Sequence, residues 1–187
     1  MSPVEDQLIA DHLALDKLLQ QLRRALDKRE LEDSRTKLDL FWARLAVHIR
    51  AEHLHLFPNV LNSLGNEQPA PLSAPTTAEA EVVIATLQSD HDFFMSELAG
   101  AVKIIRSLPA ASDPSGADEA LHKIRRKVEG VCQRLLTHNE MEENQIYRWL
   151  SMVLPVKEQV ELGRRISAEL NNRPARFTVQ AWSNVAE

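Results

Sequence analysis

The chain has 187 residues, of which 44% are hydrophobic and 26% are charged, and its formal net charge is −5 at pH 7. These values are typical of one soluble globular domain, and the acidic balance argues against a nucleic-acid partner because no basic stripe could neutralise phosphates. No apolar run is long enough to cross a membrane, and the single cysteine, Cys132, cannot form an internal disulfide. We therefore expect a cytoplasmic protein without a membrane partner.

The first predicted helix begins at a capping box, in which Ser2 precedes Glu5 by three residues, and it ends between Lys28 and Leu31. Its apolar residues recur every three or four positions, which is the spacing of one helix face, and a histidine interrupts them. The members of this stripe are Leu8, His12, Leu15, Leu19, Leu22 and Leu26.

The second predicted helix begins near Ser34. Pro58 lacks a backbone donor and should kink the helix or end its regular part, and Gly65 is the expected stop. The expected core-facing stripe reads Leu38, Phe41, Leu45, His48, Glu52, His55 and Asn59.

A proline-rich loop is expected over residues 66–76, and Thr76 with Glu79 forms a second capping box that starts the third helix. The third stripe is Ile84, Leu87, His91, Phe94, Leu98 and Ile105. The next loop is marked by Pro109, Pro114 and Gly116. A fourth helix is expected over residues 117–153, with the stripe Ile124, Val128, Val131, Leu135, His138, Glu142, Gln145 and Trp149.

Pro155 ends the fourth helix, and a shorter amphipathic helix is expected over residues 156–170. Four long helices joined by short loops predict an all-α fold, an up-down-up-down four-helix bundle with a short C-terminal helix and tail. We expect the bundle over residues 1–154. Residues 155–187 should pack on the bundle or be partly mobile.

Two His-x-x-x-Glu pairs, each preceded by an upstream histidine, interrupt the four stripes. Residues four apart on a helix share one face, and a rise of about 1.5 Å per residue brings all the interruptions to one depth of the bundle. An unpaired buried carboxylate costs several kcal/mol, so such a layer needs a partner for every member. The predicted metal ligands are His12, His48, Glu52, His91, His138 and Glu142. A purely structural polar layer is the alternative.

The ligand types favour iron over other metals. Zinc prefers four-coordinate cysteine and histidine sites, and calcium and magnesium prefer oxygen ligands. Mixed imidazole and carboxylate ligands on facing helices suit iron, or less often manganese. Four nitrogen and two carboxylate ligands suit a pair of iron ions.

At these residues the chain resembles the hemerythrin-like family, the HHE cation-binding domains, over about residues 5–153. The resemblance rests on the stretch from His48 to Pro58, in which His-x-x-x-Glu leads into Leu-Phe-Pro, and on the second copy from His138 to Tyr147. It implies a non-haem di-iron centre in which the four histidines are terminal ligands. Glu52 and Glu142 would bridge the ions, together with an oxo or hydroxo group.

One departure from the family concerns Met95, which stands where the oxygen-carrying hemerythrins have a further histidine. An open position on one iron is therefore expected. The leading expectation is a protein that binds oxygen or nitric oxide, or that senses iron or redox state. The alternatives are an enzyme that converts peroxide or nitric oxide, an iron donor for cluster repair, and a metal-free interaction bundle. An electron-donor or iron-acceptor protein is a possible partner, and the oligomeric state is left open.

Several residues near the motifs have less certain roles. His55 could be an extra ligand, a neighbour of the ligands or a proton donor, although a water-bonded histidine is favoured. His53 and His122 are expected to be exposed. Tyr147 could approach the site, and Cys132 is expected to be a small buried residue rather than a redox group. Each upstream histidine follows an aspartate, Asp11 or Asp90, that could orient a ligand or face solvent.

Overall fold

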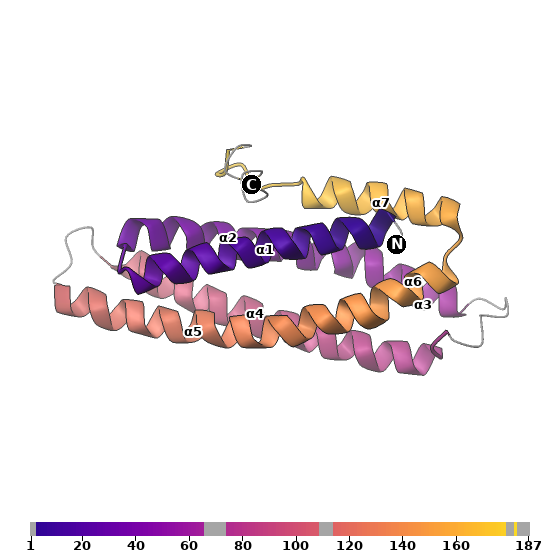
Figure 1. Cartoon of the computed structure of the whole chain (residues 1–187), viewed down its shortest axis with the longest axis horizontal. Coiled ribbons are helices and arrows are strands. Elements are labelled where there is room, and N and C mark those ends of the chain that lie inside the picture. The colour runs from indigo at the N-terminus through magenta and orange to yellow at the C-terminus, as the bar shows by residue number, and fades with distance from the viewer. Residues whose placement is uncertain (1–2, 66–73, 109–113, 179–181, 183–187) are drawn as a thin grey trace.

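The computed structural model of the chain describes residues 3–65, 74–108, 114–178 and 182. Within these residues the chain forms helices and no strand, which confirms the all-α class (Figure 1). The π-helical turns are labelled η. In chain order the elements are α1 (Pro3–Asp27), α2 (Leu31–Ala51), η1 (Glu52–Leu56), α3 (Phe57–Gly65), α4 (Thr77–Ser107), α5 (Pro114–Met141), η2 (Glu142–Ile146), α6 (Tyr147–Val153) and α7 (Val156–Leu170).

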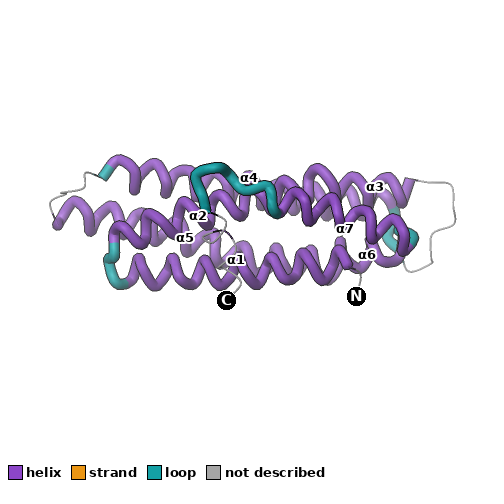
Figure 2. Tube along the Cα trace, turned by 90° about the horizontal axis from the view of Figure 1, so that it is seen from above, coloured by secondary structure: helices purple, strands orange, loops and turns teal. Residues whose placement is uncertain are grey.

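Four long helical segments pack into an elongated bundle. They are α1, α2 with its continuation through η1 and α3, α4, and α5 with its continuation through η2 and α6. Helices α1 and α4 each pack against both α2 and α5, so the four surround one core. Figures 1 and 2 show the four segments side by side along the long axis of the molecule. No described helix is both long enough and apolar enough to cross a membrane.

Most helix limits agree with the expected ones. The predicted capping box of α4 is present, since the backbone N–H of Glu79 donates to Thr76 Oγ1 at 3.2 Å and the N–H of Thr76 donates to Glu79 Oε2 at 2.8 Å. Gly65 ends α3, and α7 begins directly after Pro155. The other predicted capping box includes Ser2, which lies outside the described residues, as does most of the proline-rich loop.

Two helices begin earlier than expected. Arg29 adopts a φ of 60°, and the N–H of Glu30 donates to the carbonyl of Ala25 at 3.0 Å, which closes the end of α1 in a tight turn. Helix α2 therefore begins at Leu31 instead of near Ser34. Helix α5 begins at Pro114, which was expected in a loop, because proline fits the first helical position, where no backbone donor is needed.

Two π-helical turns interrupt the long helices at corresponding positions. Each begins at the glutamate of a His-x-x-x-Glu pair, and its last hydrogen bond joins the N–H of Phe57 to the carbonyl of Glu52, or the N–H of Tyr147 to that of Glu142. Pro58 is not the cause, because Arg148 occupies its position in the second copy. Each turn inserts one extra residue into the helix.

The extra residue shifts the buried face of the helix by one position. The predicted stripes were therefore wrong beyond each glutamate. The core-facing residues there are Leu56, Phe57, Val60, Ile146, Tyr147 and Leu150. Those predicted to face the core, His55, Asn59, Gln145 and Trp149, are only half-buried.

The apolar core divides into two clusters, one on each side of the polar layer. The larger cluster holds residues of α1 and α4 that follow the layer and residues of α2 and α5 that precede it, with Leu22 and Phe41 among its most buried members. The smaller cluster holds the opposite ends of these segments, including Leu8 and Leu87. The polar layer is thus enclosed by apolar packing above and below.

The described C-terminal part packs on this bundle. Helix α7 packs against α1 and α2, and its buried Leu162 and Ile166 belong to the smaller cluster. Trp182 is also buried, in the larger cluster, and its indole N–H donates to the carbonyl of Leu170 at 3.2 Å.

Candidate metal centre

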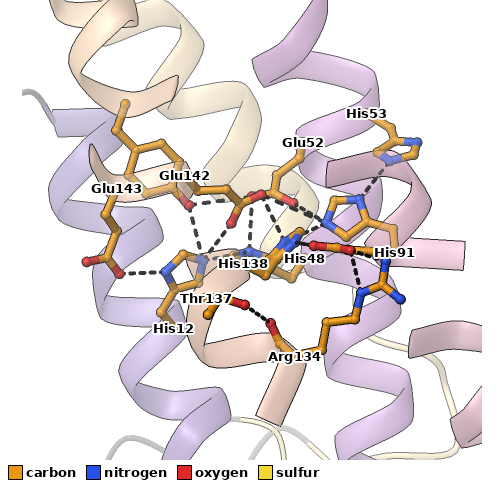
Figure 3. A network of polar contacts seen from close by, with 12 residues as sticks. His12, His48, Glu52, His53, His91, Arg134, Thr137, His138, Glu142 and Glu143 are labelled. Atoms are coloured by element: carbon orange, nitrogen blue, oxygen red, sulfur yellow. Dashed lines mark hydrogen bonds and ion pairs between the residues drawn. The ribbon is translucent and has the colours of Figure 1, made fainter. Parts of the chain in front are cut away.

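The structure brings all six predicted ligands together in the middle of the bundle (Figure 3). Helices α1, α2, α4 and α5 each supply one histidine, and η1 and η2 each supply one glutamate. Their exposed fractions lie between 0% and 4%. A buried layer of this polarity requires a compensating charge or a partner for each group.

The four histidines form two pairs that face the centre with their Nε2 atoms. The Nε2 atoms of His12 and His48 are 3.1 Å apart, and those of His91 and His138 are 3.0 Å apart. Two nitrogen ligands at right angles, each about 2.1 Å from one ion, would be about 3.0 Å apart. Each pair therefore has the spacing of two ligands on one metal ion.

Both glutamates span the two histidine pairs. One oxygen of Glu52 lies 3.2 Å from His48 Nε2, and the other lies 3.4 Å from His91 Nε2. One oxygen of Glu142 lies 3.3 Å from His12 Nε2, and the other lies 3.2 Å from His138 Nε2. Each carboxylate thus presents one oxygen to each pair, which is the arrangement of a carboxylate between two ions.

The two aspartates of the Asp-His dipeptides support ligands on neighbouring helices. His48 donates through Nδ1 to Asp11 Oδ2 at 2.9 Å, and His138 donates through Nδ1 to Asp90 at 3.2 Å. Arg44 also binds Asp11, and Arg134 binds Asp90 in the second copy. Both aspartates are buried, so the orienting role is favoured over a solvated face.

The residues after the two glutamates hold the other two histidines. His12 donates through Nδ1 to Glu143 Oε1 at 2.9 Å, and His91 Nδ1 lies 2.9 Å from His53 Nε2. The prediction that His53 is exposed was wrong, because the π-helical turn places it beside His91. The sequence did carry a signal for this, since the glutamate of each His-x-x-x-Glu pair is followed directly by a side chain that can accept a hydrogen bond.

The hydrogen bonds of the centre leave its inward nitrogen and oxygen atoms without a positively charged partner. A neutral histidine that donates through Nδ1 has only a lone pair on Nε2. Two such lone pairs face each other in each histidine pair, and they repel unless a proton or a metal cation lies between them. Glu52 Oε2 and both oxygens of Glu142 are buried and accept no hydrogen bond. The donor set therefore fits metal cations.

The pKa values describe how protons compensate for these charges in the protein without metal. Burial works against protonation of His48, yet the carboxylates of Glu52 and Asp11 outweigh it and raise the pKa of His48 well above its usual value. Nearby carboxylates likewise raise the pKa of His12 and of His138 against the effect of burial. Burial and neighbouring histidines lower the pKa of His91 to about 3.

Glu52 and Glu142 differ in their preference for a proton. Burial and the charge of Glu142 raise the pKa of Glu52. Burial also opposes ionisation of Glu142, but His138 and His12 outweigh it, and its pKa falls well below the usual value. These shifts favour protons on His12, His48 and His138, and a bound metal would displace such protons.

Tyr147 is a seventh polar group at the centre. It is fully buried, and its hydroxyl lies 3.1 Å from His12 Nε2 and 3.5 Å from Glu52 Oε1. Burial, assisted by the nearby carboxylates, raises the pKa of Tyr147 well above its usual value. The hydroxyl therefore keeps its proton beside the His12 and His48 pair.

The remaining candidates lie outside the centre. The side chain of His55 is half-buried, and none of its described contacts reaches the six ligands. His122 is exposed, as expected. Met95 packs against the larger apolar cluster. Cys132 is half-buried there too, and burial raises the pKa of its thiol, which favours the unreactive protonated form.

Comparison with known proteins places the chain in a family. Residues 4–150 match the family model of the hemerythrin HHE cation-binding domain, and this span contains all six side chains. No match is found among curated proteins or solved structures. The matched span covers most of the chain, and the buried histidines and glutamates could hold the cations that the domain binds. The chain therefore belongs to the hemerythrin HHE cation-binding domain family.

Proposed function

We propose that this protein holds two non-haem iron ions and binds oxygen or nitric oxide reversibly, or reports iron or redox state through the same centre. The observation that carries the proposal is the position of Glu52 and Glu142, each of which has one oxygen beside each histidine pair. An up-down-up-down bundle in the cytoplasm is part of the same proposal.

The residues divide into two metal positions. His12 and His48 hold one ion, and His91 and His138 hold the other. Glu52 and Glu142 would be shared by the two ions, together with an oxo or hydroxo group. Mixed nitrogen and oxygen ligands on helices favour iron. Two nitrogens, two carboxylate oxygens and the bridging oxygen would leave one position of a six-coordinate ion, which a small ligand could occupy.

The surrounding chain controls what reaches the ions. The two apolar clusters enclose the layer, so a ligand that enters must be small and can leave its water behind. Tyr147 directs a hydroxyl toward the first metal position, where it can donate a hydrogen bond to a bound ligand. The ions supply the redox change and the ligand affinity.

The first test is the iron content of the purified full-length chain, with an ultraviolet-visible spectrum recorded before and after azide is added. We expect two irons per chain and an absorption of bridged ferric ions that changes with azide. Little iron after careful reconstitution, or zinc alone, would overturn the proposal.

A matched pair of variants assigns the ions to the centre. Glu52→Gln and Glu142→Gln each remove a bridging charge and should lose bound iron. Glu140→Gln changes an exposed glutamate two residues before Glu142, and it should keep the full complement. Unchanged iron in the first two variants would contradict the ligand assignment.

The second candidate is an enzyme that converts peroxide or nitric oxide, and the buried hydroxyl of Tyr147 favours it as a hydrogen-bond donor to the bound substrate. Reduction of nitric oxide or peroxide would require electrons from a donor protein, whereas disproportionation of peroxide would require none. Turnover above that of free iron would establish this function, whereas a stable ligand complex without turnover supports reversible binding. Iron delivery to damaged clusters is a third candidate, and it requires iron that passes readily to an acceptor protein.

A further inference from the structure

The outward hydrogen bonds of the four histidines are not chemically alike. Carboxylates accept the Nδ1–H of His48, His138 and His12, while the acceptor for His91 is an imidazole. The metal position formed by His12 and His48 thus has two anionic acceptors behind it, and the position formed by His91 and His138 has one.

A metal ion bound to His91 also determines the protonation of its acceptor, His53. With an ion bound at Nε2, the proton of His91 lies on Nδ1 and points at His53 Nε2, 2.9 Å away. That nitrogen of His53 must accept, and it carries no proton. His53 is therefore a neutral imidazole with its proton on Nδ1. Its counterpart Glu143 offers a carboxylate oxygen to His12 Nδ1 instead.

The two acceptors occupy the same place in the two halves of the chain. His53 follows Glu52 on η1, and Glu143 follows Glu142 on η2. Each reaches across to the upstream histidine of the other half, as Figure 3 shows for His53 with His91 and for Glu143 with His12. Among the acceptors of the outward hydrogen bonds, the two halves therefore differ at this one position, His53 against Glu143.

An anionic acceptor makes an imidazole a better metal ligand than a neutral one does. A hydrogen bond to a charged acceptor is roughly twice as strong as one to a neutral acceptor. A charged acceptor also raises the electron density that the histidine offers to the ion. Changes in such outer partners typically alter metal affinity by about 10-fold to 100-fold.

We propose that Glu143 and His53 are positioning residues that make the two metal positions unequal, so that the ion between His12 and His48 is held more tightly than the ion between His91 and His138. This inference rests on the proposed two-ion centre. It assigns a tight and a weaker position within that centre, and it assigns the difference to the two residues that follow the bridging glutamates.

The affinity test is a titration of the metal-free full-length chain with Co²⁺ in competition with a chelator. Glu143→Gln removes the anionic acceptor and should weaken the tighter binding step by about 10-fold to 100-fold. His53→Glu supplies an anionic acceptor at the weaker position and should tighten the weaker step. The expected result is a weaker first binding step in Glu143→Gln and a stronger second binding step in His53→Glu. Circular dichroism establishes that each variant folds.

Matched controls separate hydrogen bonding from net charge. His55→Glu makes the same charge change two residues beyond His53, at a side chain without described contacts to the ligands. Glu140→Gln matches Glu143→Gln at an exposed site. Both controls should leave the two steps unchanged. Equal shifts in His53→Glu and His55→Glu would overturn the proposal, because they would reduce the effect to general electrostatics.

A Mössbauer spectrum of chains loaded with iron-57 assigns the effects to single ions. We expect two ferric doublets of equal area, one that moves in Glu143→Gln and another that moves in His53→Glu. A single doublet that neither variant splits would overturn the inequality while leaving the two-ion centre intact. Failure to bind two ions at all would overturn the proposed function itself.

Discussion

At the scale of single residues, the four histidines divide their ring nitrogens between inward and outward contacts. Each Nε2 faces the centre, and each Nδ1 is held by an acceptor on another helical segment. The outward bonds fix the ring orientation before any ion arrives, so the centre is preorganised for metal.

Protons and metal compete for the inward nitrogens, which predicts a steep pH dependence. The pKa values of His12, His48 and His138 are raised, so these rings still bind protons at pH values above 6.5, the usual pKa of histidine. Affinity for Co²⁺ should rise as the pH rises through these pKa values and the protons leave. Below them it should fall by roughly tenfold per pH unit for each displaced proton.

Calorimetry in buffers with different ionisation enthalpies counts the protons that metal binding releases. We expect at least one proton per ion near neutral pH. An affinity that does not vary between about pH 6.5 and pH 8 would show that protons do not occupy the ligands.

Tyr147 gives a second prediction at this scale. Tyr147→Phe keeps the buried ring but removes the hydroxyl beside His12, so the iron content should stay constant while the affinity for azide falls. The loss of one hydrogen bond to a charged ligand is worth about 1.5 to 3 kcal/mol, which is roughly 10-fold to 150-fold. Azide titrations of the two proteins at equal iron content make the comparison, and equal affinities would remove Tyr147 from ligand binding.

At the scale of elements, the π-helical turns η1 and η2 place the bridging glutamates and their neighbours. Each contains one residue more than an α-helical turn would. In a regular α-helix, the residue four positions after the glutamate would lie directly above it on the core face. Because of the π-helical turn, the residue five positions after the glutamate lies there instead. Tyr147 reaches the centre for this reason.

Single-residue deletions distinguish such a turn from regular helix. Removal of Asn144, an exposed residue of η2, should convert the turn to an α-helical one and keep Tyr147 on the core face. Removal of Gln133, an exposed residue in the regular part of α5, should rotate His138 and Glu142 by about 100° and destabilise the fold by more than about 4 kcal/mol.

Thermal melts followed by circular dichroism, together with metal content, report the two effects. The Asn144 deletion should melt near the parent protein but bind metal less tightly, since it displaces Glu143 from His12. Equal destabilisation by the two deletions would mean that the turn is not a removable insertion.

These turns also mark the limit of what the sequence could predict. Helical periodicity located the stripes of α1 and α4 throughout, and those of α2 and α5 up to the glutamates. A period of 3.6 residues carries no sign of one extra residue, so His55 and Trp149 were placed on the core face and His53 on the surface. Asp11 and Asp90 were left open because spacing along one helix cannot show which neighbouring helix a side chain meets.

At the scale of the whole molecule, the polar layer lies between two apolar clusters and draws ligands from four helical segments. In each histidine pair, one ring comes from α1 or α4 and the other from α2 or α5, and both glutamates touch both pairs. Bound metal therefore joins all four segments at the one level where apolar packing is interrupted.

Metal should stabilise the whole bundle. One ion at a free concentration 100 times its Kd contributes about 2.7 kcal/mol, which for a chain of this size raises Tm by roughly 5 to 11 °C. Melting the full-length chain with and without Co²⁺ measures the shift, and Glu142→Gln should lose most of it. An unchanged Tm in the parent protein at saturating metal would mean that the ions bind elsewhere or bind the unfolded chain equally well.

The burial of the six predicted ligands also limits how fast bound metal can leave the protein. A chelator cannot touch an ion enclosed in this way, so removal has to wait until neighbouring helices separate locally. The rate of metal loss should then reach a ceiling that further chelator does not raise, whereas a diatomic gas needs only brief fluctuations in packing to enter. Slow exchange of the ions and fast exchange of the gas follow from the same closed layer.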